Sequence, residues 1–375
     1  MNKYIFLLAL LTNGILYGLE TSNYYGNYDV TTKKPWRPAT SLTGPNVEEW
    51  VVPTANKPYK IGVLVPHLQD SYWLAVNYAL IKEAERLGVS LKIFSADGYN
   101  KGGVQKKQLT ENMLQEKVNG IILSSIFYDK LDHFIAQIDK IGVPIVSMIN
   151  DILSPDVKAK VTVSYYDVGY KLGEFVLADA AGKDIRIAFF PGSKQAVWAK
   201  DTYVGFFAAI NENTKTKPVG KITIVALQYD ALTSKQQQLL VDKILEVKPN
   251  INYMICNALA AKEASILVKD KYKTTQAGAK IISTYLTTDI YDLVKTKDIY
   301  GTVIDFNMEQ ARMALHLLVR YLNGEQANTK EIKFPFRTAP LFQIVTSENI
   351  NTYKPDQLFA KKDFKATYEF SAPVK

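Results

Sequence analysis

The sequence predicts an α/β protein built from two doubly wound, parallel-sheet lobes with a ligand cleft between them. From about residue 59 onward, short apolar runs alternate with amphipathic stretches of helical length. The runs are apolar at consecutive positions, which is typical of strands that are covered on both faces. Ten such strands are many for one open sheet. The stretch 153–163, with Pro155 and several charges, interrupts the alternation and indicates a division into two halves joined by crossover segments.

The expected elements follow one another at regular intervals. The strands are residues 61–66, 91–96, 120–126, 144–150, 161–165, 185–191, 221–227, 253–257, 280–286 and 299–305. The amphipathic stretches between them include 71–88, 104–118, 167–181, 196–213, 233–247 and 308–323. Glycines, which readily adopt the left-handed conformation that ends a helix, stand at positions 88, 142, 182 and 324.

Two segments of different amino-acid composition precede the lobes. Residues 1–18 join Lys3 to an apolar run too short to span about 30 Å of hydrocarbon, which predicts a secretory signal peptide and, in a bacterium, export to the periplasm. Residues 19–58 are rich in Pro and polar residues and predict an extended arm, with Trp36 and Trp50 as apolar anchors. We expect 59–163 plus 305–337 to form the first lobe, and 164–304 plus 338–375 the second lobe and tail.

Composition excludes several classes of function. The 45 Lys and Arg against 37 Asp and Glu give a charge of +8 that is spread along the chain, which favours solubility over nucleic-acid binding. A single cysteine, Cys256, can form neither an internal disulfide nor a Cys-based zinc site. The end of the first strand carries no G-x-G-x-x-G, and the chain has no Walker A motif or nucleophile elbow. We therefore expect a binding protein without cofactor or metal, not an enzyme.

Aromatic and acidic residues stand at the ends of the expected strands, where ligands of parallel sheets bind. Asp70 also suits the N-cap of the following helix, and the aromatic side chains could simply cover the strands beneath them. A cleft would bring these residues together. The predicted site comprises Tyr72, Trp73, Tyr99, Tyr165, Tyr285, Asp70, Asp305 and Trp198.

The side chains of this predicted site suit a compact cation. Aromatic faces carry negative potential and attract a quaternary ammonium group, although they also stack on sugars. Sugar sites usually add Arg, Asn and Asp around the hydroxyl groups, and Arg is scarce at the expected strand ends. The pattern therefore favours a small ligand with few polar groups.

Several motifs resemble one family over residues 59–323. The most specific is 68–74 (LQDSYWL), followed by Asn77-Tyr78, 86–92 (RLGVSLK) and Gly98-Tyr99; Pro191-Gly192, Gly205-Phe206, Gly169-Tyr170 and Tyr285-Leu286 fit as well. Together they resemble the type I periplasmic binding proteins, the superfamily of ribose-binding proteins and repressor cores. Within it, the chain is similar to the branch that senses trimethylamine N-oxide (TMAO).

The resemblance implies two lobes joined by three crossovers and a partner, the periplasmic domain of a membrane sensor histidine kinase that regulates TMAO respiration. It implies an aromatic box of Tyr72, Trp73, Tyr99, Tyr165 and Tyr285. The family often has Trp at the place of Tyr165, and Tyr attracts a cation more weakly. Asp305 would contact the ligand or make hinge hydrogen bonds.

The ligand's oxide oxygen needs a donor, and we expect the Tyr72 hydroxyl to supply it. A sugar or autoinducer binding protein of an ABC transporter is the alternative function.

Overall fold

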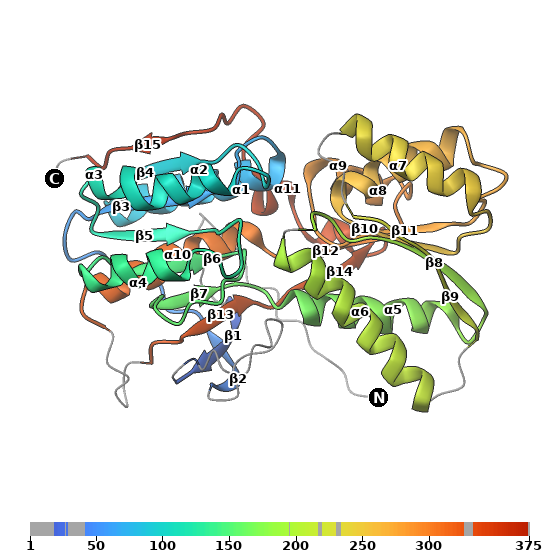
Figure 1. Ribbon diagram of the computed structural model, residues 1–375, viewed down its shortest axis with the longest axis horizontal. Helices are drawn as coiled ribbons and strands as arrows, with labels where there is room; N and C mark the ends of the chain where they lie inside the picture. The colour runs from blue at the N-terminus through green and yellow to red at the C-terminus, as the bar shows by residue number, and fades with distance from the viewer. Residues whose placement is uncertain are drawn as a thin grey trace.

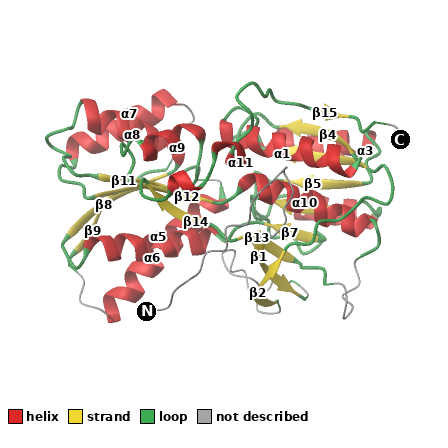
Figure 2. Cartoon of the chain, turned by 180° about the vertical axis from the view of Figure 1, so that it is seen from behind, coloured by secondary structure: helices red, strands yellow, loops and turns green. Residues whose placement is uncertain are grey.

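The structure is a computed structural model that describes residues 19–26, 28, 42–194, 196–216, 220–229, 234–325 and 333–373. The expected signal peptide, 1–18, lies outside these residues, as does Trp36. The chain folds into two α/β lobes that lie side by side, each with a central sheet between helices (Figures 1 and 2). The predicted fold class is confirmed.

The first lobe contains a nine-stranded sheet with the order β15-β4-β3-β5-β6-β7-β13-β1-β2. Its parallel centre consists of β3 (Lys60–Val65), β4 (Ser90–Ser95), β5 (Gly120–Leu123), β6 (Ile145–Met148), β7 (Ala159–Val161) and β13 (Arg337–Pro340). Antiparallel strands complete its edges: β1 (Glu20–Tyr25), β2 (Thr43–Glu49) and β15 (Glu369–Phe370).

Helices cover both faces of this sheet because its central strands are apolar on both sides. Val63 and Ile122 pack with α1 (Ser71–Leu87) and α10 (Asn307–Leu322). Leu64 and Ile121 face the other way, in the cluster formed with the helical segments of the opposite layer. These segments are α2 (Gly102–Lys107), η2 (Gln108–Asn112), α3 (Met113–Gln115) and α4 (Asp132–Lys140).

The second lobe repeats this arrangement around a six-stranded sheet with the order β14-β12-β11-β10-β8-β9. The strands are β8 (Ile185–Phe190), β9 (Ile222–Leu227), β10 (Tyr253–Cys256), β11 (Lys280–Ser283), β12 (Gly301–Ile304) and β14 (Gln343–Thr346), of which only β14 is antiparallel. One face packs on α5 (Tyr165–Ala180) and α6 (Val197–Thr216). The other packs on α7 (Ser234–Val247), α8 (Ala258–Asp270) and α9 (Thr288–Lys295). Two short helical segments, η3 (Ile350–Thr352) and α11 (Pro355–Leu358), follow β14.

Helices α5 and α6 touch through their backbones. A Cβ atom at Gly205 would lie 1.9 Å from the carbonyl oxygen of Tyr166, and one at Gly169 would lie 2.0 Å from that of Thr202. Any larger residue would push the helices apart. This contact holds the N-terminal ends of α5 and α6 next to each other at the cleft.

The strand pairing differs from the expected division at the C-terminal end of the chain. Strand β13 belongs to the first sheet, so the chain crosses after residue 340, and β15 returns to the first lobe beside β4 (Figure 1). The described chain thus passes between the sheets four times, where the resemblance implied three. Two hydrogen bonds hold this returning segment on the first lobe. Asn77 donates to the Thr367 carbonyl at 2.9 Å and accepts from the Thr367 amide at 2.7 Å.

The described parts of the expected arm are built into the first lobe. Strands β1 and β2 extend the sheet beyond β13, which an extended surface segment would not do. Trp50 is buried and donates from Nε1 to His316 Nδ1 on α10 at 2.8 Å, and His316 Nε2 lies 2.6 Å from Glu83 on α1. The expected anchoring by Trp50 is confirmed. Among the described helices, none has the length and apolarity needed to cross a membrane.

Candidate functional site

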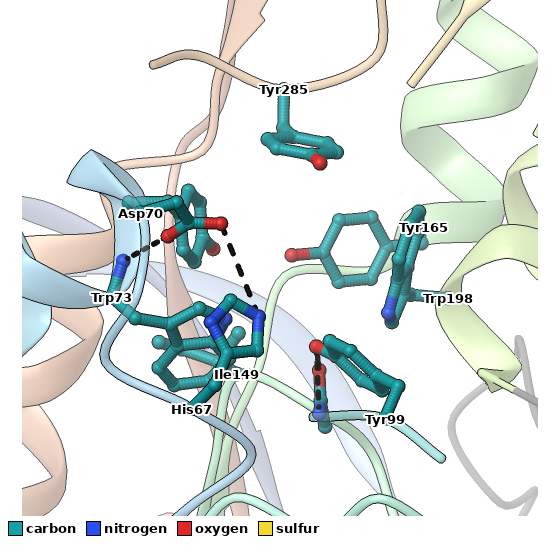
Figure 3. A pocket seen from close by; sticks show the side chains of 10 residues that line it. His67, Asp70, Trp73, Tyr99, Ile149, Tyr165, Trp198 and Tyr285 are labelled. Atoms are coloured by element: carbon teal, nitrogen blue, oxygen red, sulfur yellow. Dashed lines mark hydrogen bonds and ion pairs between the residues drawn. The ribbon is translucent and has the colours of Figure 1, made fainter. Parts of the chain in front are cut away.

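A cavity of about 50 Å³ lies between the lobes, where the strands of both sheets end (Figure 3). Seven of the eight predicted site residues line it, and Asp305 lies behind them. The full lining is His67, Asp70, Tyr72, Trp73, Tyr99, Ile149, Asn150, Tyr165, Trp198 and Tyr285.

The N-terminus of α1 positions the first two aromatic side chains. Asp70 is the N-cap, and its Oδ1 accepts a hydrogen bond from the Trp73 amide at 2.9 Å. This cap fixes the first turn of the helix, in which Tyr72 and Trp73 are buried against the cleft. The other oxygen of Asp70, Oδ2, lies 3.9 Å from His67 Nε2. Asp70 is therefore both a cap and part of the cavity wall.

Aromatic rings from the two lobes meet edge to face around the cavity. Tyr72 of the first lobe contacts Tyr285 of the second, with ring centroids 5.5 Å apart. Tyr99 of the first lobe contacts Trp198 of the second at 6.3 Å, and Trp198 also contacts Tyr285 at 5.7 Å. Because these contacts cross the cleft, the shape of the cavity depends on how the lobes are placed.

Trp198 reaches the cavity from the first turn of α6, which lies against α5. Its ring is 6.3 Å from that of Tyr165, the first residue of α5. Gly192 (φ 121°) makes room for the indole, since a Cβ there would lie 2.4 Å from its Cη2 atom. The close packing of the two helices thus places Tyr165 and Trp198 side by side.

Asp305 joins two of the tyrosines from behind. It lies in the crossover between β12 and α10 and accepts from the Tyr72 hydroxyl at 2.5 Å and from the Tyr165 hydroxyl at 3.1 Å, both on Oδ2. Gln310 donates to its backbone carbonyl at 2.8 Å. Burial raises the pKa of Asp305, and burial together with this carboxyl holds the pKa of Tyr72 and Tyr165 well above the usual range. Both tyrosines therefore stay protonated donors.

The role of the Tyr72 hydroxyl differs from our expectation that it would donate to the ligand. A tyrosine has one proton to donate, and that of Tyr72 is given to Asp305. The side chain can offer a ligand its ring face but not, in this arrangement, the hydrogen bond that we expected. Asp305 itself makes crossover hydrogen bonds, the second of the two roles considered for it.

His67, Ile149 and Asn150 also line the cavity, although we did not select them from the sequence. They stand just after β3 and β6, so the strand-end rule could have included them. Asn150 is buried and donates from Nδ2 to the Ser125 carbonyl at 2.8 Å and to the Tyr99 hydroxyl at 3.2 Å. It supports the ring of Tyr99.

The electrostatics of the cavity favour positive charge. Its described lining contains no Lys or Arg, whereas Asp70 is part of the wall and Asp305 lies directly behind two of the rings. Burial lowers the pKa of His67, which keeps its ring neutral near pH 7. In the described part of the chain, no group of three or more His, Cys, Asp or Glu is placed to hold a metal ion.

Comparison with known proteins gives a family and several relatives. The family model for the periplasmic binding protein domain matches residues 61–326. Periplasmic protein TorT of Escherichia coli K12 is 28% identical over 276 residues, which cover 73% of this chain and 76% of TorT. The ribose import binding protein RbsB of Bacillus subtilis is 22% identical and covers 60% of this chain and 72% of RbsB.

Solved structures show the same fold. A solute binding protein of an ABC transporter from Bradyrhizobium, with bound bis-tris, has a TM-score of 0.76 at 25% identity and covers 96% of this chain and 99% of that one. TorT in complex with the TorS sensor domain in the presence of TMAO has a TM-score of 0.69 at 25% identity, covering 83% and 99%. A solute binding protein from Actinobacillus succinogenes with bound D-allose, 20% identical, has a TM-score of 0.69 and covers 79% and 100%.

Proposed function

The chain belongs to the periplasmic binding protein domain family, and we propose that it senses TMAO, or a related N-oxide or quaternary amine, and signals to a membrane histidine kinase. Its family and its similarity to TorT make it a periplasmic ligand-binding protein and not an enzyme. The ligand is held between the lobes, and the lobes carry the signal to the periplasmic domain of the kinase.

The aromatic lining of the cleft is the observation that carries this proposal. Rings from both lobes surround the cavity, Asp305 stands behind two of them, and the described lining contains neither Lys nor Arg. A trimethylated nitrogen is positive at its centre and apolar outside, so ring faces can enclose it. Each desolvated cation–π contact stabilises such a ligand by about 2 kcal/mol, before the cost of ordering the lobes is subtracted.

The size of the cavity supports a ligand about as small as TMAO. One water molecule takes up roughly 10–15 Å³ on this measure, so a cavity of about 50 Å³ holds about four waters. TMAO has one non-hydrogen atom more than that, whereas a hexose has about three times that number. A sugar would require the lobes to stand further apart.

Signalling to a kinase is supported by the likeness to TorT in its complex with the TorS sensor domain. A ligand can shift an equilibrium between lobe arrangements only by binding one of them more tightly. Contacts across the cleft, such as Tyr72 with Tyr285, give TMAO that differential affinity. A kinase domain that binds one arrangement of the lobes then responds to whether the cavity holds a ligand.

A sugar or autoinducer binding protein of an ABC transporter is the second candidate function. It is favoured by the similarity to RbsB and by relatives of the same fold whose structures contain sugars. Asp70, Asn150 and His67 are the polar side chains that such a ligand could use.

Calorimetric titration of the protein from residue 19 onward tests the proposal, with TMAO as ligand and ribose and dimethyl sulfoxide as controls. We expect saturable binding of TMAO alone. Heat with ribose and none with TMAO would instead assign the protein to sugar transport. The absence of binding heat with all three ligands would refute both candidate functions.

Trp73 provides the first variant. Trp73→Ala should abolish TMAO binding while the protein stays folded, because the indole forms a wall of the cavity. Trp50→Ala is the matched control: it removes an equally buried indole outside the cavity, so it should lower stability and leave TMAO affinity near wild type. Wild-type affinity in Trp73→Ala would refute the assignment of the cavity.

A further inference from the structure

An amine N-oxide and a tetraalkylammonium ion differ in one way that the cavity must detect. Both present a positive nitrogen inside an apolar shell, but the N-oxide carries a negatively charged oxygen in place of one methyl group and therefore has no net charge. A buried acceptor oxygen that finds no donor costs about 1–3 kcal/mol. Preference for the N-oxide therefore requires a hydrogen-bond donor that is aimed into the cavity and not already used.

Most donors around the cavity have a protein partner. The hydroxyl protons of Tyr72 and Tyr165 both go to Asp305, at 2.5 and 3.1 Å. Asn150 Nδ2 donates to the Ser125 carbonyl and to the Tyr99 oxygen. Ile149 and Asp70 offer the cavity no side-chain donor.

The indole N–H groups lie close to one acceptor inside the cavity wall. The side chains of Trp73 and Trp198 both lie close enough to the Tyr99 hydroxyl to lower the pKa of Tyr99 against the larger effect of burial, and an indole can only donate. The Tyr99 hydroxyl accepts from Asn150 Nδ2 at 3.2 Å and donates to Asn150 Oδ1 at 3.3 Å, which leaves its oxygen one lone pair for an indole N–H. These contacts hold the two indoles against Tyr99 in the wall of the box.

His67 has a donor that remains. Its ring lines the cavity between Trp73 and Tyr99, with centroid distances of 6.0 and 5.7 Å (Figure 3). The amide of Gln69 donates to Nδ1 at 3.4 Å, so in the neutral ring the proton sits on Nε2. Asp70 Oδ2 lies 3.9 Å from Nε2, which is beyond hydrogen-bond distance, and its charge attracts this edge of the ring.

We propose that His67 donates a hydrogen bond from Nε2 to the ligand's oxygen and makes the site prefer an amine N-oxide to a tetraalkylammonium ion. This assignment rests on the proposed function of the cleft. His67 takes the place that we expected for the Tyr72 hydroxyl, and the aromatic faces bind the methyl groups that the two ligands share.

Paired titrations with TMAO and tetramethylammonium test the assignment. The two ligands have nearly the same shape but differ in net charge as well as in the oxygen, so the change in their affinity ratio from wild type to variant isolates the contribution of the oxygen. His67→Phe keeps a flat ring against Trp73 and Tyr99 but removes the N–H. We expect the TMAO affinity of this variant to fall about tenfold relative to its tetramethylammonium affinity, the typical effect of one hydrogen bond.

Two further variants control for structure. His67→Gln keeps an N–H donor at the end of the side chain and should recover part of the preference for TMAO. His133→Phe changes an exposed histidine on α4, away from the cavity, and should keep the wild-type ratio. Binding of tetramethylammonium to His67→Phe shows that this variant is folded.

Every other outcome is decisive. An equal loss of both ligands, or no loss, in His67→Phe would overturn the role of His67 as donor. The hydroxyl of Tyr285 also lies at the cavity, and a selective loss of TMAO in Tyr285→Phe with none in His67→Phe would move the donor there. A wild-type protein that binds neither ligand would refute the proposed function itself.

Discussion

At the scale of single residues, one hydrogen bond decides what Tyr72 can do. Its place after the first strand was visible in the sequence, and so was Asp305 at the end of the tenth. Their contact at 2.5 Å was not, because 233 residues separate them. The contact turns a hydroxyl that could have served a ligand into a link between the box and the crossover.

Asp201 is the second residue whose chemistry depends on distant neighbours. It lies in the first turns of α6, is 4% exposed, and its Oδ1 has no hydrogen-bond partner. The ion pair between Asp151 and Arg337 of the first lobe lies close enough to act on it. Burial above all, and then the charge of Asp151, raises the pKa of Asp201 to about 8, against the opposing effect of Arg337 and Lys200.

This shift predicts a pH dependence of stability. The unfolded carboxyl has its ordinary pKa of 3.8, so between about pH 4 and pH 8 the folded protein holds one more proton than the unfolded chain. The free energy of unfolding therefore falls as pH rises through that window, because the folded protein holds this proton and the unfolded chain does not. Asp201→Asn cannot ionise, so its advantage in unfolding free energy over wild type should grow by about 3 kcal/mol from pH 5 to pH 8.

Urea unfolding of both proteins at the two pH values measures this difference. Lys200→Gln, one position earlier on α6, serves as control and should show little change in the pH dependence. A constant difference between Asp201→Asn and wild type would show that the carboxyl ionises in the folded state as it does in the unfolded chain.

At the scale of elements, the approach of α5 to α6 sets the geometry of the second lobe's half of the box. Gly205→Ala would place a Cβ against the Tyr166 carbonyl and force the helices apart. We expect a loss of about 2 kcal/mol in stability and a clear loss of TMAO affinity, because Tyr165 and Trp198 separate.

Gly278→Ala is the matched control for this prediction. It lies in the same lobe at φ 82°, and a Cβ there meets nothing within 4 Å. It should cost about 1 kcal/mol through backbone strain and leave affinity unchanged. Calorimetric titration and thermal unfolding of both variants compare the two effects. Equal affinities would show that the helix contact does not position the box.

Sequence patterns predicted β3 to β12 and missed the strands before and after them, β1, β2, β13, β14 and β15. All ten expected strands are present, from β3 to β12, and most of them are buried on both faces and so are apolar at consecutive positions, while β4 and β9 are partly exposed. Strands β2 and β15 form the two edges of the first sheet, where exposure leaves no such pattern, and β1 next to β2 is only partly buried. Their pairing depends on partners far away in sequence, such as Asn77 for the segment that leads to β15.

At the scale of the whole molecule, the C-terminal segment ties the second lobe back to the first. Removing residues 366–375 would delete β15, both hydrogen bonds between Asn77 and Thr367, and the ion pair of Lys92 with Glu369 at 2.9 Å. We expect the melting temperature to fall by about 5 °C, measured by scanning calorimetry.

A shorter deletion of residues 373–375 keeps all of these contacts and should melt like the full chain. Equal melting temperatures for the two deletions would mean that the return of the chain to the first lobe adds nothing to stability.

The sequence by itself determined the fold class, the order of the buried strands and the positions from which most of the cavity is lined. These follow from local regularities: apolar periodicity, and the rule that parallel strands end at a common edge. Only the tertiary structure decided which strands close the sheets, where the chain returns between the lobes, and which donors are already used. The physical reason is that hydrogen bonds such as those of Asp305 and Asn77 join residues hundreds of positions apart, and their pairing leaves no periodic trace along the chain.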